Sequence, residues 1–416
     1  MRITEITITP IAVPDVPLLN TKGVHQQVFL RSVIELRTDA GITGLSETYG
    51  AARTLDALRR TAPALIGLDV HDLNGLCARI LDALPDGGGI NAPTMLADHK
   101  KVDVAYSAWE IALLDIRGKA LGRPVCDLLG GAVRDRVAFG AYLFFKFAKP
   151  ADQVGEDRFG EVMTPDALVD QARAFVAEHG FRSLKLKGGV LEPEAEIETV
   201  LKLREVFPDH PLRIDPMGAW RVETALRVID RLDGVLEYLE DPVRGLDAMA
   251  ELSARTDMPL ASNLVTVEFE DVIAAARRDA VQIVLSDHHY WRGATGALTL
   301  GRICEAAGLG VGMHSNSHLG ISLAAMIHVA AATPNLTYDV DTHYPWSRHD
   351  IVAGGRAVFR NGTLPVPMGP GLGVELDRTA LADLAALYDR VMMQDRDDTD
   401  EMRKYLPDYV RKVPRW

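Results

Sequence analysis

The sequence predicts an α/β protein: a (β/α)8-type barrel, preceded by an α+β capping domain that the C-terminal tail completes. At 416 residues the chain exceeds what one hydrophobic core usually serves. Eight short β-rich runs alternate with helical segments, which is the rhythm of such a barrel, whereas strands and then helices come before them. We expect the capping domain at 1–135, the barrel at 136–375 and the returning tail at 376–416.

The first 50 residues read as strands. The runs "ITEITITPIAV" and "FLRSVIELRTDAGITGLSE" are strand-like, and Asp39 with Gly41 marks a hairpin-like turn between two strands. From about residue 54 to 122 the apolar period becomes helical, and the segment "YSAWEIALLDIRGKALG" stops at Gly122 and Pro124. This order predicts the α+β module.

The predicted barrel strands are "VAFGAYLFF", "SLKLK", "LRIDP", "VLEYLEDP", "PLASN", "VQIVLSD", "GVGMHSNSH" and "LTYDVD". The segments between them, such as "VETALRVIDRL", are helical by period. A doubly wound sheet is the alternative, but it usually shows a glycine fingerprint after its first strand, and the sequence has none. After about residue 375 we expect one more helix, "RTALADLAALYDRVMMQ", and a polar tail that folds back onto the first module.

Composition and charge narrow the classes of function. A net charge of -13 argues against nucleic acid and against a basic membrane-binding face. No apolar run reaches the roughly 18 residues of a membrane span, and we expect no signal peptide. The three cysteines are far apart and follow no disulfide or zinc spacing, so a reducing cytoplasm is expected. An anionic small molecule stays possible, because a metal ion and local lysines can invert the field inside a cleft.

Polar residues gather at the predicted carboxyl ends of the barrel strands, where barrel enzymes build their sites. One such residue could cap the next helix, but residues at almost every strand end in turn are harder to explain in this way. From Lys187 onward they are 23 to 28 residues apart, roughly one β/α unit. The set comprises Lys185, Lys187, Asp215, Glu240, Asn263, Asp287, His314, Asp341 and His343.

The residue types in this set indicate metal-assisted acid–base chemistry. Asp215, Glu240 and Asn263 offer only oxygen ligands, which suits Mg²⁺. Asp287 is well placed to bond one nitrogen of His314 and raise its basicity. Lysines two apart on a strand share a face, and like charges weaken each other's hold on a proton. The pair at 185 and 187 therefore predicts a general base.

These residues, in this order, resemble the enolase superfamily, and more closely its glucarate dehydratase group. The likeness covers nearly the whole chain, and "LKLKGGV" together with "HSNSH" and "DTH" is specific to that group. "DPMGAW", "EDP", "SDHHYW" and "PGLGVELD" match as well. Superfamily sites of this kind use a Lys or His base with Mg²⁺.

The resemblance implies a reaction on an acid sugar dicarboxylate. Mg²⁺ would bind one carboxylate, a base would remove the proton on the adjacent carbon, and the resulting enediolate would expel the β-hydroxyl. The two bases would be Lys187 and His314, with Asp287 orienting His314 and Lys185 contacting the metal-bound carboxylate. A homo-oligomer is also expected. The residues implied to hold the substrate are His25, Thr94, Tyr142, Asn316, His343 and Arg396.

Two positions depart from the family pattern. Met217 stands where the family has an asparagine after Asp215 and Pro216, and a methionine cannot donate a hydrogen bond to a substrate hydroxyl. A pocket built around that polar group would hold the usual sugar acid less well. His288 stands where the group usually has proline, beside the retained Asp287.

Three functions therefore stay open. The first is a glucarate-type dehydratase, weakly active on glucarate if Met217 matters. The second is a racemase, epimerase or cycloisomerase of carboxylates, which needs the same two bases but no β-elimination. The third is a binding homologue without catalysis, which the complete set of bases and metal residues disfavours.

Overall fold

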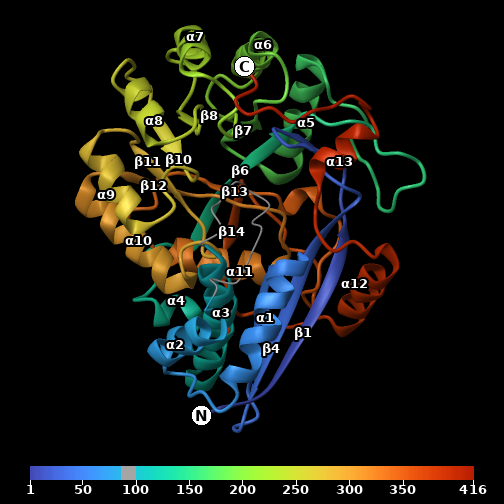
Figure 1. Cartoon of the computed structure of the whole chain (residues 1–416), viewed down its shortest axis with the longest axis vertical. Coiled ribbons are helices and arrows are strands. Elements are labelled where there is room, and N and C mark those ends of the chain that lie inside the picture. The colour runs from blue at the N-terminus through green and yellow to red at the C-terminus, as the bar shows by residue number, and fades with distance from the viewer. Residues whose placement is uncertain (86–99) are drawn as a thin grey trace.

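The computed structural model describes residues 1–85 and 100–416. Figure 1 shows a capping region of strands and helices around the N-terminus, and a larger β/α region that contains the middle of the chain. One continuous cluster of buried apolar side chains runs through both regions, from Ile3 and Trp109 to Leu239 and Leu372. The capping region and the barrel therefore share a hydrophobic core.

The capping region is built on an antiparallel sheet. Its strands are β1 (Ile3–Pro14), β4 (Val28–Thr38) and β5 (Thr43–Tyr49), in the order β1-β4-β5. A small hairpin of β2 (Leu19–Asn20) and β3 (Gly23–Val24) interrupts the run between β1 and β4. The helices are α1 (Ala52–Leu65), α2 (Leu73–Ala83), α3 (Lys101–Leu121) and α4 (Val125–Leu128).

The helix expected to stop at Gly122 does so. Gly122 adopts φ 65°, a left-handed conformation that glycine takes without a steric penalty, and its N–H bonds back to the end of α3. The predicted order of strands followed by helices is confirmed for the described part of this module.

The barrel has eight parallel strands among the described residues, as the sequence predicts. They follow the order β12-β11-β10-β9-β8-β7-β6-β13, and a parallel bridge between Val311 and Leu336 joins the two ends. The short β14 (Thr363–Pro365) adds to β6 antiparallel. The barrel strands are β6 (Arg136–Phe144), β7 (Leu184–Lys187), β8 (Leu212–Asp215), β9 (Tyr238–Glu240), β10 (Leu260–Ser262), β11 (Ile283–Ser286), β12 (Gly310–Met313) and β13 (Val340–Thr342).

Helices follow the strands in turn and cover the outside of the barrel. The last of them, α11, is buried over its whole length, because it packs against α4 and β5 of the capping region as well as against β6. In the described ranges no helix is both long and apolar enough to cross a bilayer. The helices are α5 (Pro165–His179), α6 (Pro193–Val206), α7 (Val222–Leu232), α8 (Leu246–Ser253), α9 (Phe269–Arg277), α10 (Gly293–Ala307) and α11 (Gly320–Ala332), followed by the 3-10 turn η2 (Tyr344–Trp346) after β13.

The C-terminal tail packs first on the capping region. Helix α12 (Arg378–Val391) lies against β1, and α13 (Asp398–Arg403) lies against β3. The last residues then leave that region and reach the barrel, where Arg415 N–H donates to the carbonyl of Ala219 (2.7 Å) and Arg221 N–H donates to Trp416 (2.8 Å). Figure 1 shows the C-terminus beside α6 accordingly. The domain boundaries at 135 and 375 stay predictions.

Candidate active site

The carboxyl ends of β6 to β9 bring the predicted residues to one edge of the barrel. In the parallel register Tyr142 lies beside Lys185, and Lys187 lies beside Asp215. Glu240 is the last residue of β9. The spacing of one β/α unit in the sequence thus becomes lateral proximity in the sheet, as a barrel requires.

Each lysine of the pair has its own carboxylate partners. Lys185 Nζ forms ion pairs with Glu240 and with Asp341 Oδ2, the latter at 2.5 Å. Lys187 Nζ lies 2.6 Å from Asp215 Oδ2. Burial disfavours the charged form of Lys185, but Asp341 and Glu240 outweigh it and hold the pKa of Lys185 well above its usual range. Lys185 is therefore a permanent cation rather than a group that only repels Lys187.

The carboxyl groups of Asp215 and Glu240 in this cluster have opposite pKa shifts. Burial, with the negative charge of Asp215, raises the pKa of Glu240 well above its ordinary range, although Lys185 opposes the shift. Burial would also raise the pKa of Asp215, but Lys187 and Lys185 outweigh it and lower that pKa. Glu240 Oε2 pairs with Lys185, and Oε1 has no hydrogen-bond partner among the described residues. Such an oxygen fits a further cation.

Asn263, the third predicted metal ligand, follows β10 and is half-buried. It lines a small neighbouring pocket together with Asp287 and His314. Its backbone N–H donates to Asp241 Oδ2 (2.9 Å), which holds the strand end in place. With Asp215 and Glu240 it forms a set of oxygen donors of the kind that Mg²⁺ prefers, so these residues could hold that ion.

Asp287 bonds two histidines. Its carboxylate lies 3.1 Å from Nδ1 of His314 and 2.8 Å from Nδ1 of His289. Burial alone would raise the pKa of Asp287, but the charge and hydrogen bonds of His289 and His314 hold it well below the usual range. The interaction expected between Asp287 and His314 is present, and it leaves Nε2 of His314 to exchange protons.

His288 is buried behind this group. Burial lowers its pKa well below the usual range, and the adjacent His289 adds to that effect, so His288 is neutral. Its Nδ1 has no hydrogen-bond partner among the described residues. Its ring packs against that of His289 at 4.0 Å between centroids. His288 therefore acts here as a packing group beside the Asp287 pair.

The capping region holds the loop that follows His314. Glu47, on β5, accepts hydrogen bonds from the N–H groups of Leu319 and Ser322, each at 2.9 Å. It also pairs with Arg31 Nε at 2.8 Å, and both side chains are buried. Arg31 in turn lies 3.3 Å from Nε2 of His289. The sequence offered no signal for this link, since both residues lie in ordinary strand patterns.

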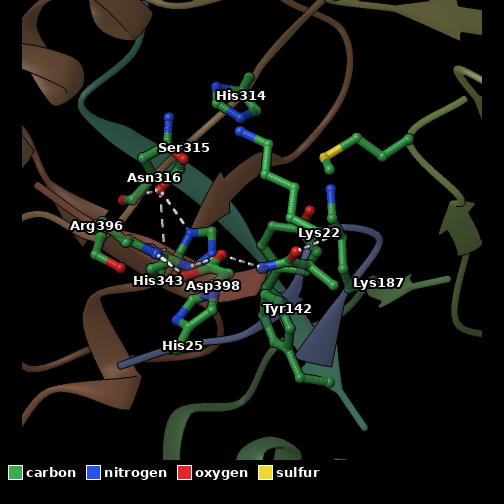
Figure 2. A pocket seen from close by; sticks show the side chains of 14 residues that line it. Lys22, His25, Tyr142, Lys187, His314, Ser315, Asn316, His343, Arg396 and Asp398 are labelled. Carbon is green, nitrogen blue, oxygen red and sulfur yellow. Dashed lines mark hydrogen bonds and ion pairs between the residues drawn. The ribbon is translucent and has the colours of Figure 1, made fainter. Parts of the chain in front are cut away.

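Several predicted residues line one pocket, a cavity of about 50 Å³ (Figure 2). Lys185 and Asp215 lie behind Tyr142, whose hydroxyl donates to Asp215 Oδ2 at 3.1 Å and whose ring lies under the Lys185 ammonium. Thr94 lies outside the residues that the structure describes. The predicted residues that line this pocket are His25, Tyr142, Lys187, His314, Asn316, His343 and Arg396.

Protein contacts already orient most of these pocket side chains. His25 Nδ1 lies 3.0 Å from Asp15, and Asn316 donates to the hydroxyls of Tyr49 (2.8 Å) and Tyr290 (3.2 Å). Burial holds the pKa of His343 well below its usual range, and the neighbouring histidines and Lys187 add to that effect. His343 is therefore a neutral imidazole.

Arg396 reaches the pocket from the C-terminal tail but does not bring a free charge. Its Nε and Nη2 bond both carboxylate oxygens of Asp398, at 2.5 and 2.8 Å. Asp398 also accepts from Asn20 (2.8 Å). The pocket thus includes Asn20, Lys22 and Asp398, none of which the sequence analysis named. Lys22 sits three residues before His25 in "NTKGVH", and that proximity was the available signal.

Comparison with known families agrees with this fold. The chain matches the family described as "Enolase C-terminal domain-like" over residues 167–380, and "Mandelate racemase / muconate lactonizing enzyme, N-terminal domain" over residues 3–130. It therefore belongs to the enolase superfamily and, within it, to a glucarate dehydratase-like group.

Individual relatives align over the whole chain. A protein named "Probable glucarate dehydratase" from Streptomyces coelicolor is 48% identical, with 100% of this chain and 99% of that protein covered. An enolase from Mycobacterium smegmatis, solved with tartrate, is 52% identical with a TM-score of 0.95, covering 100% and 98%. An enolase from Pseudomonas fluorescens with bound magnesium, potassium and tartrate is 44% identical with a TM-score of 0.96, covering 100% and 99%.

The cluster of buried carboxylates predicts that a divalent cation stabilises the fold. Mg²⁺ at a hundredfold excess over its Kd should add about 2.7 kcal/mol to the free energy of unfolding, visible as a higher Tm. Asp215→Asn and Glu240→Gln should remove most of this shift, and Asp215→Ala and Glu240→Ala should lose activity while staying folded.

Glu237→Gln is the matched control, because Glu237 lies on the same strand region but pairs with Arg213. It should keep the Mg²⁺-dependent rise in Tm. An unchanged shift in both Asp215→Asn and Glu240→Gln, or activity that survives EDTA, would contradict this metal site.

Proposed function

We propose that the protein is a Mg²⁺-dependent dehydratase of acid sugars of the glucarate type, a hydro-lyase that forms a keto-deoxy sugar diacid. The observation that supports this most is that two basic side chains, Lys187 and His314, line one pocket beside a cluster of buried carboxylates. The 48% identity to a protein named as a probable glucarate dehydratase supports the substrate class.

The metal and Lys185 act on the carboxylate end of the substrate. Mg²⁺ held by Asp215, Glu240 and Asn263 would bind one carboxylate and stabilise the negative charge that develops there. The enolase from Pseudomonas fluorescens with bound magnesium supports this cofactor. Lys185, held cationic by Asp341 and Glu240, adds positive charge at the same oxygens.

Lys187 and His314 move the protons. Either one removes the proton on the carbon next to the bound carboxylate, depending on the configuration of that carbon. His314 then gives a proton from Nε2 to the β-hydroxyl, which leaves as water when the C–O bond breaks. Asp287 holds Nδ1 of His314 and stabilises the protonated ring. The resulting enol takes up a proton at carbon and becomes the 2-keto product.

The remaining pocket residues orient the rest of the sugar acid. Hydrogen-bonding side chains line the cavity, namely those of His25, Tyr142, Asn316 and His343. The resemblance implies a substrate-binding role for Thr94 as well. Arg396 adds donors next to Asp398. We assign these residues to substrate binding rather than to chemistry, as the resemblance to the glucarate dehydratase group implies.

The reaction product separates this function from its alternatives. Mixed with a panel of acid sugars and Mg²⁺, the protein should release a 2-keto product from one or more of them, measured with a semicarbazide assay. A racemase or epimerase would instead exchange the proton without forming keto product, and a cycloisomerase would form a lactone or open one. A binding protein without catalysis would do none of these.

The two bases should act on opposite faces of the substrate carbon. Lys187→Ala should stop deuterium exchange from D₂O on one epimer and leave the His314-dependent exchange on the other, as followed by NMR. His314→Ala should do the reverse, and it should also slow elimination from both epimers because the leaving hydroxyl loses its acid. Equal loss on both epimers in both variants would refute the two-face arrangement.

Met217 should limit the rate on glucarate. It lines the pocket, is 6% exposed and has φ 51°, a left-handed conformation that asparagine adopts more readily than methionine. Met217→Asn should raise kcat/KM on glucarate by roughly tenfold to a hundredfold through one regained hydrogen bond. It should also raise Tm, since relieving this backbone strain gains about 1 kcal/mol.

Met217→Leu is the control, because it keeps the apolar character and the strained backbone. It should leave both kcat/KM and Tm close to those of the wild type. If asparagine and leucine behave alike, the position is a packing site, and the expectation of a slow or altered glucarate reaction is wrong.

A further inference from the structure

Lys22 lines the pocket but has no part in the proposed reaction. It lies in the turn between β2 and β3, and its side chain extends into the pocket that Lys187, His314 and Arg396 line (Figure 2). A lysine in a tight turn would ordinarily point into solvent. Here the pocket includes it because the C-terminal tail covers the hairpin.

The tail fixes the backbone of this turn. Lys22 N–H donates to Asn20 Oδ1 (2.7 Å), and Thr399 of α13 donates from its hydroxyl to the carbonyl of Lys22 (2.8 Å). The next residue, Gly23, has φ 147°, and a Cβ there would overlap the carbonyl of Asp398. The close contact between the hairpin and α13 thus fixes the backbone position of Lys22 at the pocket wall.

The ammonium of Lys22 lacks a direct counter-ion. No carboxylate of the described residues forms an ion pair with it. Asp398 attracts it, but Asp398 is already engaged by Arg396 and Asn20. Burial lowers the pKa of Lys22 to about 7, since Asp398 does not offset burial and the repulsion from Arg396, Arg411 and Lys187. An anion in the pocket would supply the missing partner.

The proposed substrate brings two carboxylates, and the other residues account for only one. Asp215, Glu240, Asn263 and Lys185 serve the carboxylate at the reacting end. Arg396 cannot balance the second by itself, because Asp398 already neutralises it. We propose that Lys22 binds the second, remote carboxylate of the substrate and thereby makes the enzyme prefer diacids to monoacids. This inference rests on the proposed function.

Binding of this kind couples the substrate to a proton. A carboxylate beside Lys22 favours its charged form, so the complex takes up a proton at a pH where free Lys22 is mostly neutral. Affinity for the diacid should accordingly fall as the pH rises above about 7. The other titratable or charged groups around Lys22 and its pocket are His25, Tyr142, Lys187, His314, His343, Arg396, Asp398 and Arg411.

D-Glucarate and D-gluconate form the matched pair of ligands, because they differ only in a carboxylate or a hydroxymethyl group at the remote end. Lys22→Met, which keeps an unbranched side chain one atom shorter and removes the charge, should raise KM for glucarate by roughly tenfold to a hundredfold, as for a lost charged hydrogen bond. The inhibition constant of gluconate should change by less than about twofold on the same grounds. Lys22→Arg should retain most of the preference for the diacid.

Proton uptake provides a second readout that a merely structural role would not move. Calorimetric titration with adipate, a six-carbon diacid that has no β-hydroxyl to eliminate, at pH 8 in two buffers of different ionisation enthalpy, should show uptake by the Mg²⁺-loaded wild type. The uptake should disappear in Lys22→Met, while the other groups around the pocket are unchanged. Uptake that is equal in the wild type and the variant would assign the proton to another group and overturn the inference.

The outcomes separate this inference from the function on which it rests. Suppose that the wild type forms keto product. If Lys22→Met then weakens the binding of glucarate and of gluconate by the same factor, or changes the binding of neither, Lys22 does not recognise the second carboxylate. If the wild type converts no acid sugar, the proposed function fails. In that case the effect of Lys22→Met on the calorimetric Kd of glucarate, compared with its effect on the Kd of gluconate, still decides whether Lys22 binds a carboxylate.

Discussion

The site depends on how buried charges balance at the carboxyl ends of the barrel strands. Three carboxylates, from Asp215, Glu240 and Asp341, face two ammonium groups, from Lys185 and Lys187, and the guanidinium of Arg213 lies 3.9 Å from Asp341. Without water to screen them, removing one partner of such a pair typically costs about 3–5 kcal/mol. The cluster therefore holds its members in place, and a metal cation could replace the proton that burial and Asp215 favour on Glu240.

Lys185 shows how this balance also ties the barrel together. Its partners Glu240 and Asp341 come from β9 and β13, which lie two strands away on either side of β7 in the sheet. An ammonium group can reach both only from the interior of a closed barrel. The charged state of Lys185 therefore depends on the closure of the barrel.

The capping region contributes to the same site through its own buried pair. Glu47 and Arg31 connect β5 and β4 to the loop after β12 and to His289, and His289 shares Asp287 with His314. His314, which we propose transfers protons, is thereby held from the capping region. The shared hydrophobic core keeps the two regions in the arrangement that these contacts require.

The sequence by itself determined the barrel and most of its strand-end residues, because parallel strands repeat one unit of length and carry their polar residues at the same end. It also identified Met217 and His288 as departures. Only the tertiary structure decided which groups the strand-end residues contact. The two lysines were expected chiefly to repel each other, yet the neighbouring strand β8 gives Lys187 a carboxylate partner, and closure of the barrel gives Lys185 two. Likewise Lys22 faces the pocket, and Asn20 bonds Asp398, because α13 packs on the β2–β3 hairpin. The contacts between the β2–β3 hairpin and α13 join residues more than 370 positions apart, such as Asn20 and Asp398, and no local sequence pattern predicts them.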